Sequence, residues 1–127
     1  MKPLSGRGPQ PISPGRIVWA VAPSSRGEGK IRPLIVATRR VDILKGSNIS
    51  AIGCSTVFSE PLLPIEIRLP SRPDGKCITG LKQDTVAVCD WIEAFSSGIV
   101  FEMGGIVPGD LLRLIFKTAG ILLPPER

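Results

Sequence analysis

The sequence predicts a mainly β protein, a small antiparallel barrel or sandwich that ends in an α-helix. From residue 16 onward, short β-branched runs alternate with glycine- and proline-rich turns, a pattern typical of small all-β folds. A helical spacing of apolar residues follows near the C-terminus. With 127 residues, 43% of them hydrophobic, the chain is long enough for one compact core and too short for several domains.

Six apolar runs are expected to form the strands. Each run is bounded by glycine, proline or small polar residues, which favour turns. The six runs are 17–21, 34–37, 49–58, 65–69, 85–89 and 99–101. Run 65–69 alternates apolar and charged residues, as a half-exposed strand does. Asp74 and Gly75 predict the turn that follows this strand.

The last apolar stretch, residues 108–119, predicts an amphipathic helix. Its apolar residues stand at 111, 112, 115, 116 and 119, which lie on one face of a helix. Pro108 suits the first turn and Asp110 favours the positive end of the helix dipole. Pro124 is expected to end the helix, which should lie across the barrel.

The ends of the chain differ in composition from its middle. Residues 1–14 are rich in proline and glycine and predict a flexible basic arm, residues 15–123 form the single domain, and residues 124–127 are a short tail. No leader peptide or membrane-spanning run is visible, and the three cysteines lack metal-binding spacing. We therefore expect a soluble, cytoplasmic protein with free thiols and no membrane partner.

Basic residues are concentrated in the first third of the chain. Residues 1–40 carry eight basic side chains and one acidic, whereas the rest of the chain carries eight basic and ten acidic. This asymmetry indicates a polyanionic partner, because a basic surface that neutralises phosphates releases their counterions.

Histidine is absent from the sequence. Its absence excludes Ser-His-Asp and Cys-His catalysis, two-histidine ribonuclease chemistry and most zinc sites. We expect neither a metal nor a cofactor, so any chemistry depends on arginine, lysine, carboxylates, hydroxyls or cysteine.

The segment 24–33, between the first two expected strands, is a candidate phosphate-binding loop. Gly27 and Gly29 let the backbone approach a ligand, and Pro33 biases Arg32 toward extended geometry at the start of the second strand. A guanidinium held on a strand beside a basic loop suits a phosphodiester. The alternative is an ordinary solvated hairpin loop. The other charged residues of this segment are Arg26, Glu28 and Lys30.

Two adjacent hydroxyls interrupt the third apolar run. Ser55 and Thr56 are neighbours on the expected strand, so they face opposite sides and only one of them can point into a given cleft. The alternative is a pair of polar residues that simply ends a strand.

The order of these segments resembles the PemK/MazF growth-inhibitor toxins of bacterial type II toxin–antitoxin modules. The similar segments are 15–19, 27–36, 53–56, 79–90 and 105–108 with the helix that follows, so the resemblance extends over 15–123. It implies an SH3-like β-barrel with a C-terminal helix, the fold shared by PemK, MazF and CcdB. It also implies a homodimer that cleaves single-stranded RNA, usually mRNA, at specific sequences without a metal and is silenced by an antitoxin protein.

The resemblance implies a catalytic pair of Arg32 and Ser55, with Thr56 as the one-residue alternative for the hydroxyl. Glu28 is a weaker candidate for a proton acceptor. RNA brings its own nucleophile, the 2′-hydroxyl, so the enzyme need only position it and stabilise the charge that develops on phosphorus. The expected products are a 2′,3′-cyclic phosphate and a 5′-hydroxyl. The residues expected to hold the RNA are Arg26, Gly27, Gly29, Lys30, Arg72 and Lys76.

Aromatic residues are too few to predict a stacking surface. We expect Trp19, Phe58, Phe95, Phe101 and Phe116 to be core residues. Trp91 is left open between core and RNA platform.

Two other functions remain open for this barrel. A toxin resembling CcdB, which poisons DNA gyrase, depends on a C-terminal Trp-Gly-Ile contact, whereas this chain ends in Leu-Pro-Pro-Glu-Arg. A non-catalytic barrel that only binds a partner is the second alternative.

Overall fold

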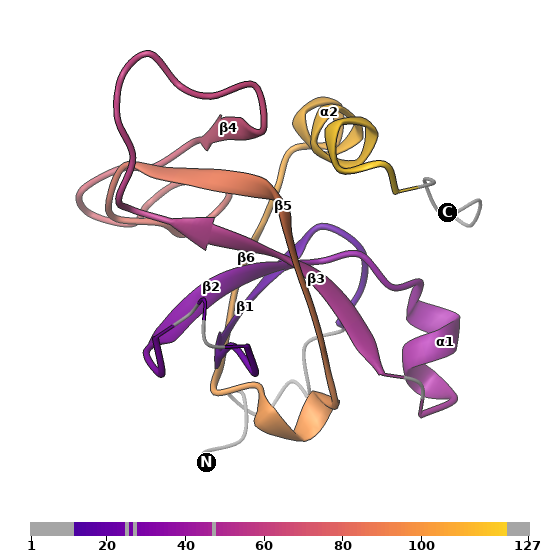
Figure 1. Cartoon of the computed structure of the whole chain (residues 1–127). Helices are drawn as coiled ribbons and strands as arrows, with labels where there is room; N and C mark the ends of the chain where they lie inside the picture. Colours follow the sequence, from indigo (N-terminus) through magenta and orange to yellow (C-terminus); the bar gives the residue numbers. More distant parts are fainter. Residues whose placement is uncertain (1–11, 25, 27, 47, 122–127) are drawn as a thin grey trace.

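A single antiparallel sheet of six strands curls into a half-barrel, with one helix packed over its concave side (Figure 1). The computed structural model describes residues 12–121 except 25, 27 and 47. The strand order is β4-β5-β3-β2-β1-β6. The predicted fold class, a mainly β barrel with a C-terminal helix, is confirmed.

The strands are β1 (Arg16–Val21), β2 (Ile31–Val36), β3 (Ile49–Ser55), β4 (Glu66–Leu69), β5 (Thr85–Phe95) and β6 (Glu102–Ile106). The helical elements are α1 (Arg40–Leu44), the 3-10 turn η2 (Ser97–Ile99) and α2 (Gly109–Ala119). Helix α1 was not predicted, because five residues are too few for a periodic pattern.

The sixth strand lies later in the chain than predicted. Residues 97–99 form η2 and the strand is Glu102–Ile106, so the prediction of a strand over 99–101 was wrong. Gly104 and Gly105 have low strand propensity, so the sequence did not indicate β6. Pairing with β1 stabilises the strand. The third run ends at Ser55, short of the predicted residue 58, and the fifth continues to Phe95 beyond the predicted residue 89.

The connection from β4 to β5 covers the outer edge of β6. The amide of Gly105 donates to the carbonyl of Thr79 at 3.0 Å, and that of Ile106 donates to Ile78 at 2.9 Å. The backbones meet so closely that a Cβ on Gly105 would lie 2.1 Å from the Ile78 oxygen. This contact brings the segment that follows Thr79 to the outer edge of β6. In the sheet, β1 separates β6 from β2 and β3.

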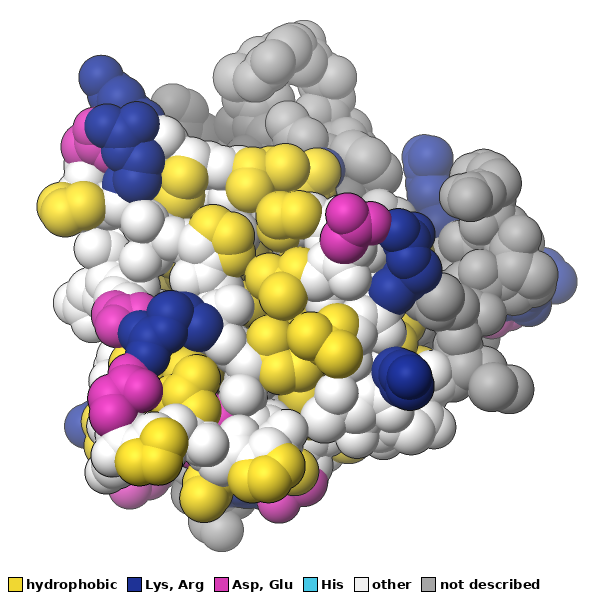
Figure 2. All heavy atoms as spheres, turned by 90° about the horizontal axis from the view of Figure 1, so that it is seen from above, with side chains coloured by type: hydrophobic (Ala, Val, Ile, Leu, Met, Phe, Trp, Pro, Cys, Tyr) yellow, Lys and Arg dark blue, Asp and Glu magenta, His cyan; other side chains and the backbone are white. Residues whose placement is uncertain are grey.

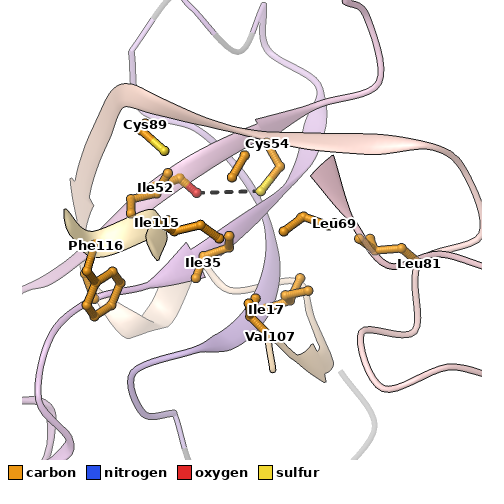
Figure 3. Packing of buried hydrophobic residues seen from close by; sticks show 12 residues of the cluster. Ile17, Ile35, Ile52, Cys54, Leu69, Leu81, Cys89, Val107, Ile115 and Phe116 are labelled. Atoms are coloured by element: carbon orange, nitrogen blue, oxygen red, sulfur yellow. Dashed lines mark hydrogen bonds between the residues drawn. The ribbon is translucent and has the colours of Figure 1, made fainter. Parts of the chain in front are cut away.

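One face of the sheet and α2 enclose the main core (Figure 3). Ile115 and Phe116 are the buried residues of α2 and lie against the sheet. The helix ends because Gly120 adopts a left-handed conformation, φ 76°, and its amide donates to the carbonyl of Lys117 at 3.2 Å. The predicted stop at Pro124 is therefore not what ends the helix.

The opposite face of the sheet carries two smaller clusters. The first contains Val18, Ala20, Leu34, Val36, Ile49, Ala51 and Phe95. The second forms around Trp91, which is 5% exposed and lies over Gly53. A Cβ on Gly53 would come 2.1 Å from the indole ring, so only glycine fits beneath it.

Figure 2 shows the face that carries β4, the loop before it and α2. Hydrophobic side chains gather in the middle of this view, while basic and acidic side chains stand mostly toward its edges. The exposed apolar residues of these elements include Val57, Leu63 and Leu114.

The predicted arm and tail fall mostly outside the described residues. Of residues 1–14 the structure describes 12–14, where Ile12 packs against the cluster of Val18 and Leu34. The limits proposed for the domain therefore stay predictions. In the part of the chain that is described, no helix has both the length and the apolar character needed to span a membrane.

We predict that Gly53→Ala destabilises the fold by about 1–3 kcal/mol, because the new methyl group overpacks the Trp91 ring. Urea unfolding followed by circular dichroism measures the change. Gly109→Ala is the matched control, because a Cβ there comes no closer than 4.0 Å to another side chain and alanine favours the helix. Equal stability of the two variants would show that the indole yields without cost.

Candidate functional site

A hollow of about 630 Å³ lies where the pairing of β2 with β3 ends, beyond Leu34 and Gly53. Arg32 on β2 and Thr56 after β3 both line it. The remaining lining comes from β1, β2, β3 and β6, and from the segment that leads into the first residue of β5. Those residues are Trp19, Ile31, Pro33, Cys54, Gly80, Leu81, Lys82, Gln83, Thr85, Glu102, Met103, Gly104 and Gly105.

Arg32 is the second residue of β2, as the position of Pro33 predicted. It stands opposite Ala20 of β1, and its side chain is 19% exposed. Its Nη2 lies 3.5 Å from Oε1 of Glu28, whose side chain is 67% exposed. Glu28 itself has a positive φ of 58°, an uncommon conformation for a residue other than glycine. The strand therefore holds the guanidinium, and the loop brings a carboxylate to it.

The two hydroxyls that the sequence singled out lie on different sides of β3. Cys54 belongs to the main core beneath α2, so the alternation of side chains places Ser55 on the opposite face, with Gly53. Leu34 pairs with Gly53, and Arg32 and Ser55 each lie two residues farther along their strands, so the alternation of side chains puts both on the same face of the sheet.

Ser55 is also held by its own turn. Its Oγ accepts from the amide of Val57 at 3.0 Å and lies 3.2 Å from the Val57 carbonyl, to which it can donate. Thr56, by contrast, is exposed and lines the hollow. The structure thus places Ser55 on the face of Arg32 and Thr56 on the wall of the hollow.

The basic residues expected to hold RNA do not line the hollow. Arg26 pairs with Asp90 at 3.0 Å and lies 5.5 Å from the centre of the Trp91 ring. Lys30 and Gly29 are exposed on the same loop, and Gly27 lies outside the described residues.

Arg72 and Lys76 flank the turn after β4. Asp74 accepts from Nη2 of Arg72 at 3.2 Å and from the backbone amide of Lys76 at 2.9 Å. Gly75 has a positive φ of 72°, which fits the turn predicted at Asp74 and Gly75.

Sequence reasoning missed four polar residues of the hollow, Lys82, Gln83, Thr85 and Glu102. Lys82 and Gln83 follow the glycine of the segment that covers β6, and that contact could not be anticipated from spacing. Glu102 begins a strand that the sequence placed elsewhere.

Trp19, expected in the core, packs against it but is only half-buried and also lines the hollow. Trp91, which the sequence left open between core and platform, is buried. Phe101 was also expected in the core and is 59% exposed, because it directly precedes β6 at its start. Phe95 and Phe116 are buried as predicted.

The three cysteines are free thiols. Burial, reinforced by Cys89, raises the pKa of Cys54. Burial and Asp90 raise the pKa of Cys89 to about 11, so both thiols stay protonated at neutral pH. Cys77 is half-buried, and a hydrogen bond with Thr79 lowers its pKa. Within the described ranges, no group of three or more metal-ligating side chains occurs.

Glu93 ties the β1–β2 loop to the sheet. It is 4% exposed and accepts from the Trp91 indole at 2.6 Å, from the Ser24 amide at 3.2 Å and from the Ser24 hydroxyl. Burial by itself would raise the pKa of this carboxyl, but the hydrogen bonds from Ser24 and Trp91 outweigh it, so the pKa is lowered. The ionised carboxylate therefore holds the loop that leads to Arg32.

We predict that Glu93→Gln lowers the free energy of unfolding by about 2 kcal/mol at pH 7, because the charged acceptor is lost. Since the folded pKa of Glu93 is lowered, its contribution is present above the unfolded pKa and disappears as the pH falls through the folded value. Urea unfolding at pH 7 and at pH 3 should therefore show a difference from wild type that shrinks in acid. Asp110→Asn, at a side chain 96% exposed, is the control. An equal deficit at both pH values would contradict the assignment.

Comparisons with known proteins bear on the fold. Neither a protein-family model nor a curated protein matches the sequence. Among solved structures, MazF from Deinococcus radiodurans is similar with a TM-score of 0.66 at 20% identity, over 85% of this chain and 92% of that one. A MazE–MazF structure from the same organism has a TM-score of 0.63 at 17% identity, over 85% and 90%. The Mycobacterium tuberculosis toxin MazF-mt6 has a TM-score of 0.61 at 18% identity, over 81% and 92%. The chain therefore has the fold of the MazF toxins.

Proposed function

We propose that this protein is a toxin of the PemK/MazF family and acts as a metal-independent endoribonuclease on single-stranded RNA. The observation that carries the proposal is the placement of Arg32 and the hydroxyls of Ser55 and Thr56 around one end of the β2–β3 pair. The likeness to MazF structures, which extends over 81–85% of this chain, supports it.

The reaction needs few protein groups. The 2′-hydroxyl of the RNA attacks the adjacent phosphorus, the bond from phosphorus to the 5′-oxygen breaks, and the proton lost from the 2′-oxygen is balanced by one gained at the 5′-oxygen. The products are a 2′,3′-cyclic phosphate and a 5′-hydroxyl. Arg32 stabilises the additional negative charge on the phosphorane oxygens, a contribution of about 3–4 kcal/mol. A strand holds this guanidinium, so little reorganisation is needed.

We assign the hydroxyl role to Ser55. It shares a face with Arg32, and the Val57 amide, which donates to its Oγ at 3.0 Å, holds the oxygen in place before substrate arrives. When RNA binds, the hydroxyl turns its single proton from the Val57 carbonyl to a non-bridging phosphate oxygen. Thr56, on the wall of the hollow, contacts the bound nucleotide instead. Glu28, at 3.5 Å from Arg32, positions the guanidinium and is the nearest candidate for a proton acceptor.

Two turns that carry basic side chains hold the rest of the RNA. The turns carry Arg26, Gly27, Gly29 and Lys30 on one side and Arg72 and Lys76 on the other. Arg26 and Arg72 are paired with exposed carboxylates. Such exposed pairs contribute at most about 1 kcal/mol, so RNA phosphates can replace them.

The same family membership implies protein partners. We propose a cognate antitoxin, a homodimeric state and a cytoplasmic location. A MazE–MazF structure is among the similar structures, which supports an antitoxin partner for this chain. Size-exclusion chromatography with light scattering tests the dimer independently of the nuclease.

A single assay tests the function. Purified protein is incubated with a long single-stranded RNA in EDTA, and the new ends are mapped. Cuts at a recurring sequence with 2′,3′-cyclic phosphate and 5′-hydroxyl ends support the proposal. Gyrase-dependent DNA breakage without RNA cleavage would instead indicate a CcdB-like toxin, and inactivity in both assays a barrel that only binds a partner.

We predict that Arg32→Ala lowers the cleavage rate by about 100- to 1,000-fold, because the phosphorane loses its fixed cation. Single-turnover cleavage of a labelled RNA measures the rate. Arg113→Ala is the control, because Arg113 is exposed on α2 and pairs with Asp110. A rate for Arg32→Ala within about threefold of wild type, in a variant with an unchanged circular dichroism spectrum, would remove Arg32 from the mechanism.

We predict that Ser55→Ala lowers the single-turnover rate by about 100-fold, whereas Thr56→Val changes mainly the affinity for RNA. The reason is their placement on different sides of β3. Measuring the rate over a range of protein concentrations separates the two effects. The reverse pattern would transfer the catalytic role to Thr56.

A further inference from the structure

We propose that the hollow beside Arg32 is a base-binding subsite that selects guanine. This inference rests on the proposed action on single-stranded RNA and names the nucleotide that the site holds. The hollow, at about 630 Å³, lies within the size range of small-ligand pockets and is large enough for one nucleotide. Its floor and walls combine a ring for stacking with hydrogen-bonding groups.

Trp19 provides the stacking surface. The indole is half-buried and lines the hollow, and its partners across the sheet are Pro33 on β2 and Glu102 on β6. Directly paired residues share a face, so the three form one row across the wall. A Cβ on Gly104 would lie 3.2 Å from the indole Nε1, so the missing side chain leaves room for the ring. Stacking of a base on an aromatic ring contributes about 1–3 kcal/mol.

Glu102 decides which base the hollow prefers. An ionised carboxylate only accepts hydrogen bonds, and with two oxygens it can accept two of them side by side. Guanine presents two adjacent donors on its Watson–Crick edge, N1–H and the N2 amino group, whereas the same edges of uracil, adenine and cytosine each carry one donor group. Because Glu102 stands next to Trp19, a base stacked on the indole turns its edge toward this carboxylate.

The remaining polar groups fit a nucleotide rather than a free base. Gln83 and Thr56 can bond the other edges of the base or the ribose, Lys82 adds a cation for phosphate, and Arg32 borders the same hollow. Lys82 is held against the turn before it, since a Cβ on Gly75 would come 3.2 Å from its Cε. A guanine in the hollow therefore brings its own phosphate toward Arg32, where the proposed cleavage occurs.

Binding to DNA pentamers tests the subsite without cleavage, because DNA lacks the 2′-hydroxyl. Four fluorescently labelled pentamers of thymidine are compared, with thymine, guanine, adenine or cytosine at the centre, by fluorescence anisotropy. We expect wild type to bind the guanine pentamer about tenfold more tightly than the other three. Glu102→Gln should reduce this preference to within about twofold, while Asp110→Asn, a matched loss of one exposed carboxylate, retains it.

Stacking is tested with a second pair of variants. Trp19→Ala should weaken binding of all four pentamers by about tenfold, and Phe101→Ala, which removes an exposed aromatic ring that does not line the hollow, should leave it unchanged. Trp19→Phe keeps a ring and most of the core contact, and it should retain most of the affinity even if Trp19→Ala does not fold.

Equal binding of the four pentamers by wild type, a preference for another base, or a guanine preference that survives Glu102→Gln would overturn the subsite. Parallel assays on RNA separate this inference from the proposed function. Guanine preference without RNA cleavage supports the subsite and overturns the nuclease. RNA cleavage without a guanine preference in the pentamers does the opposite.

Discussion

The position of β2 between β1 and β3 is the constraint on which the rest of the molecule depends. Ile35 and Val36 are fully buried and pair with Ile52 and Ala51, so a shift of one residue would turn the buried side chains of this strand to the wrong face. The same register sets Arg32 opposite Ala20 on β1 and on the face of the sheet that carries Leu34 and Gly53, the face of Ser55. The packing of apolar residues thus determines where the candidate catalytic cation stands.

The strands and the β1–β2 loop position different parts of the site. Sheet pairing holds Arg32, while Glu93, which also accepts from the Trp91 indole, anchors Ser24 at the start of the loop that leads to Arg32. A second connection, 78–83, closes against β6 and supplies Lys82 and Gln83 to the hollow. The site is therefore assembled from segments distant in sequence. Glu93 acts on it through the loop, since it is hydrogen-bonded to Ser24 and not to Ser55 or Thr56.

Local sequence signals predicted the elements that depend mainly on their own residues and little on contacts with distant segments. The helix over 108–119 follows from its apolar spacing, and the start of β2 follows from Pro33. The sixth strand does not, because Gly104 and Gly105 have weak strand propensity and are held by pairing with β1 and with the Ile78–Thr79 backbone. Lys82 and Glu102 were missed for the same reason, since only the closure of the sheet brings them together. The tryptophans could not be told apart, because the space above Gly53 that buries Trp91 is a property of the folded sheet.

A crystal structure of the protein with an uncleavable single-stranded RNA, 2′-O-methylated throughout, would show whether Arg32 and Ser55 contact the same phosphate. We expect the Arg32 guanidinium and the Ser55 hydroxyl both to lie within hydrogen-bonding distance, about 3 Å, of oxygens on one phosphate. A phosphate bound at Arg26, Arg72 or elsewhere, with Arg32 and Ser55 contacting different groups or none, would contradict it.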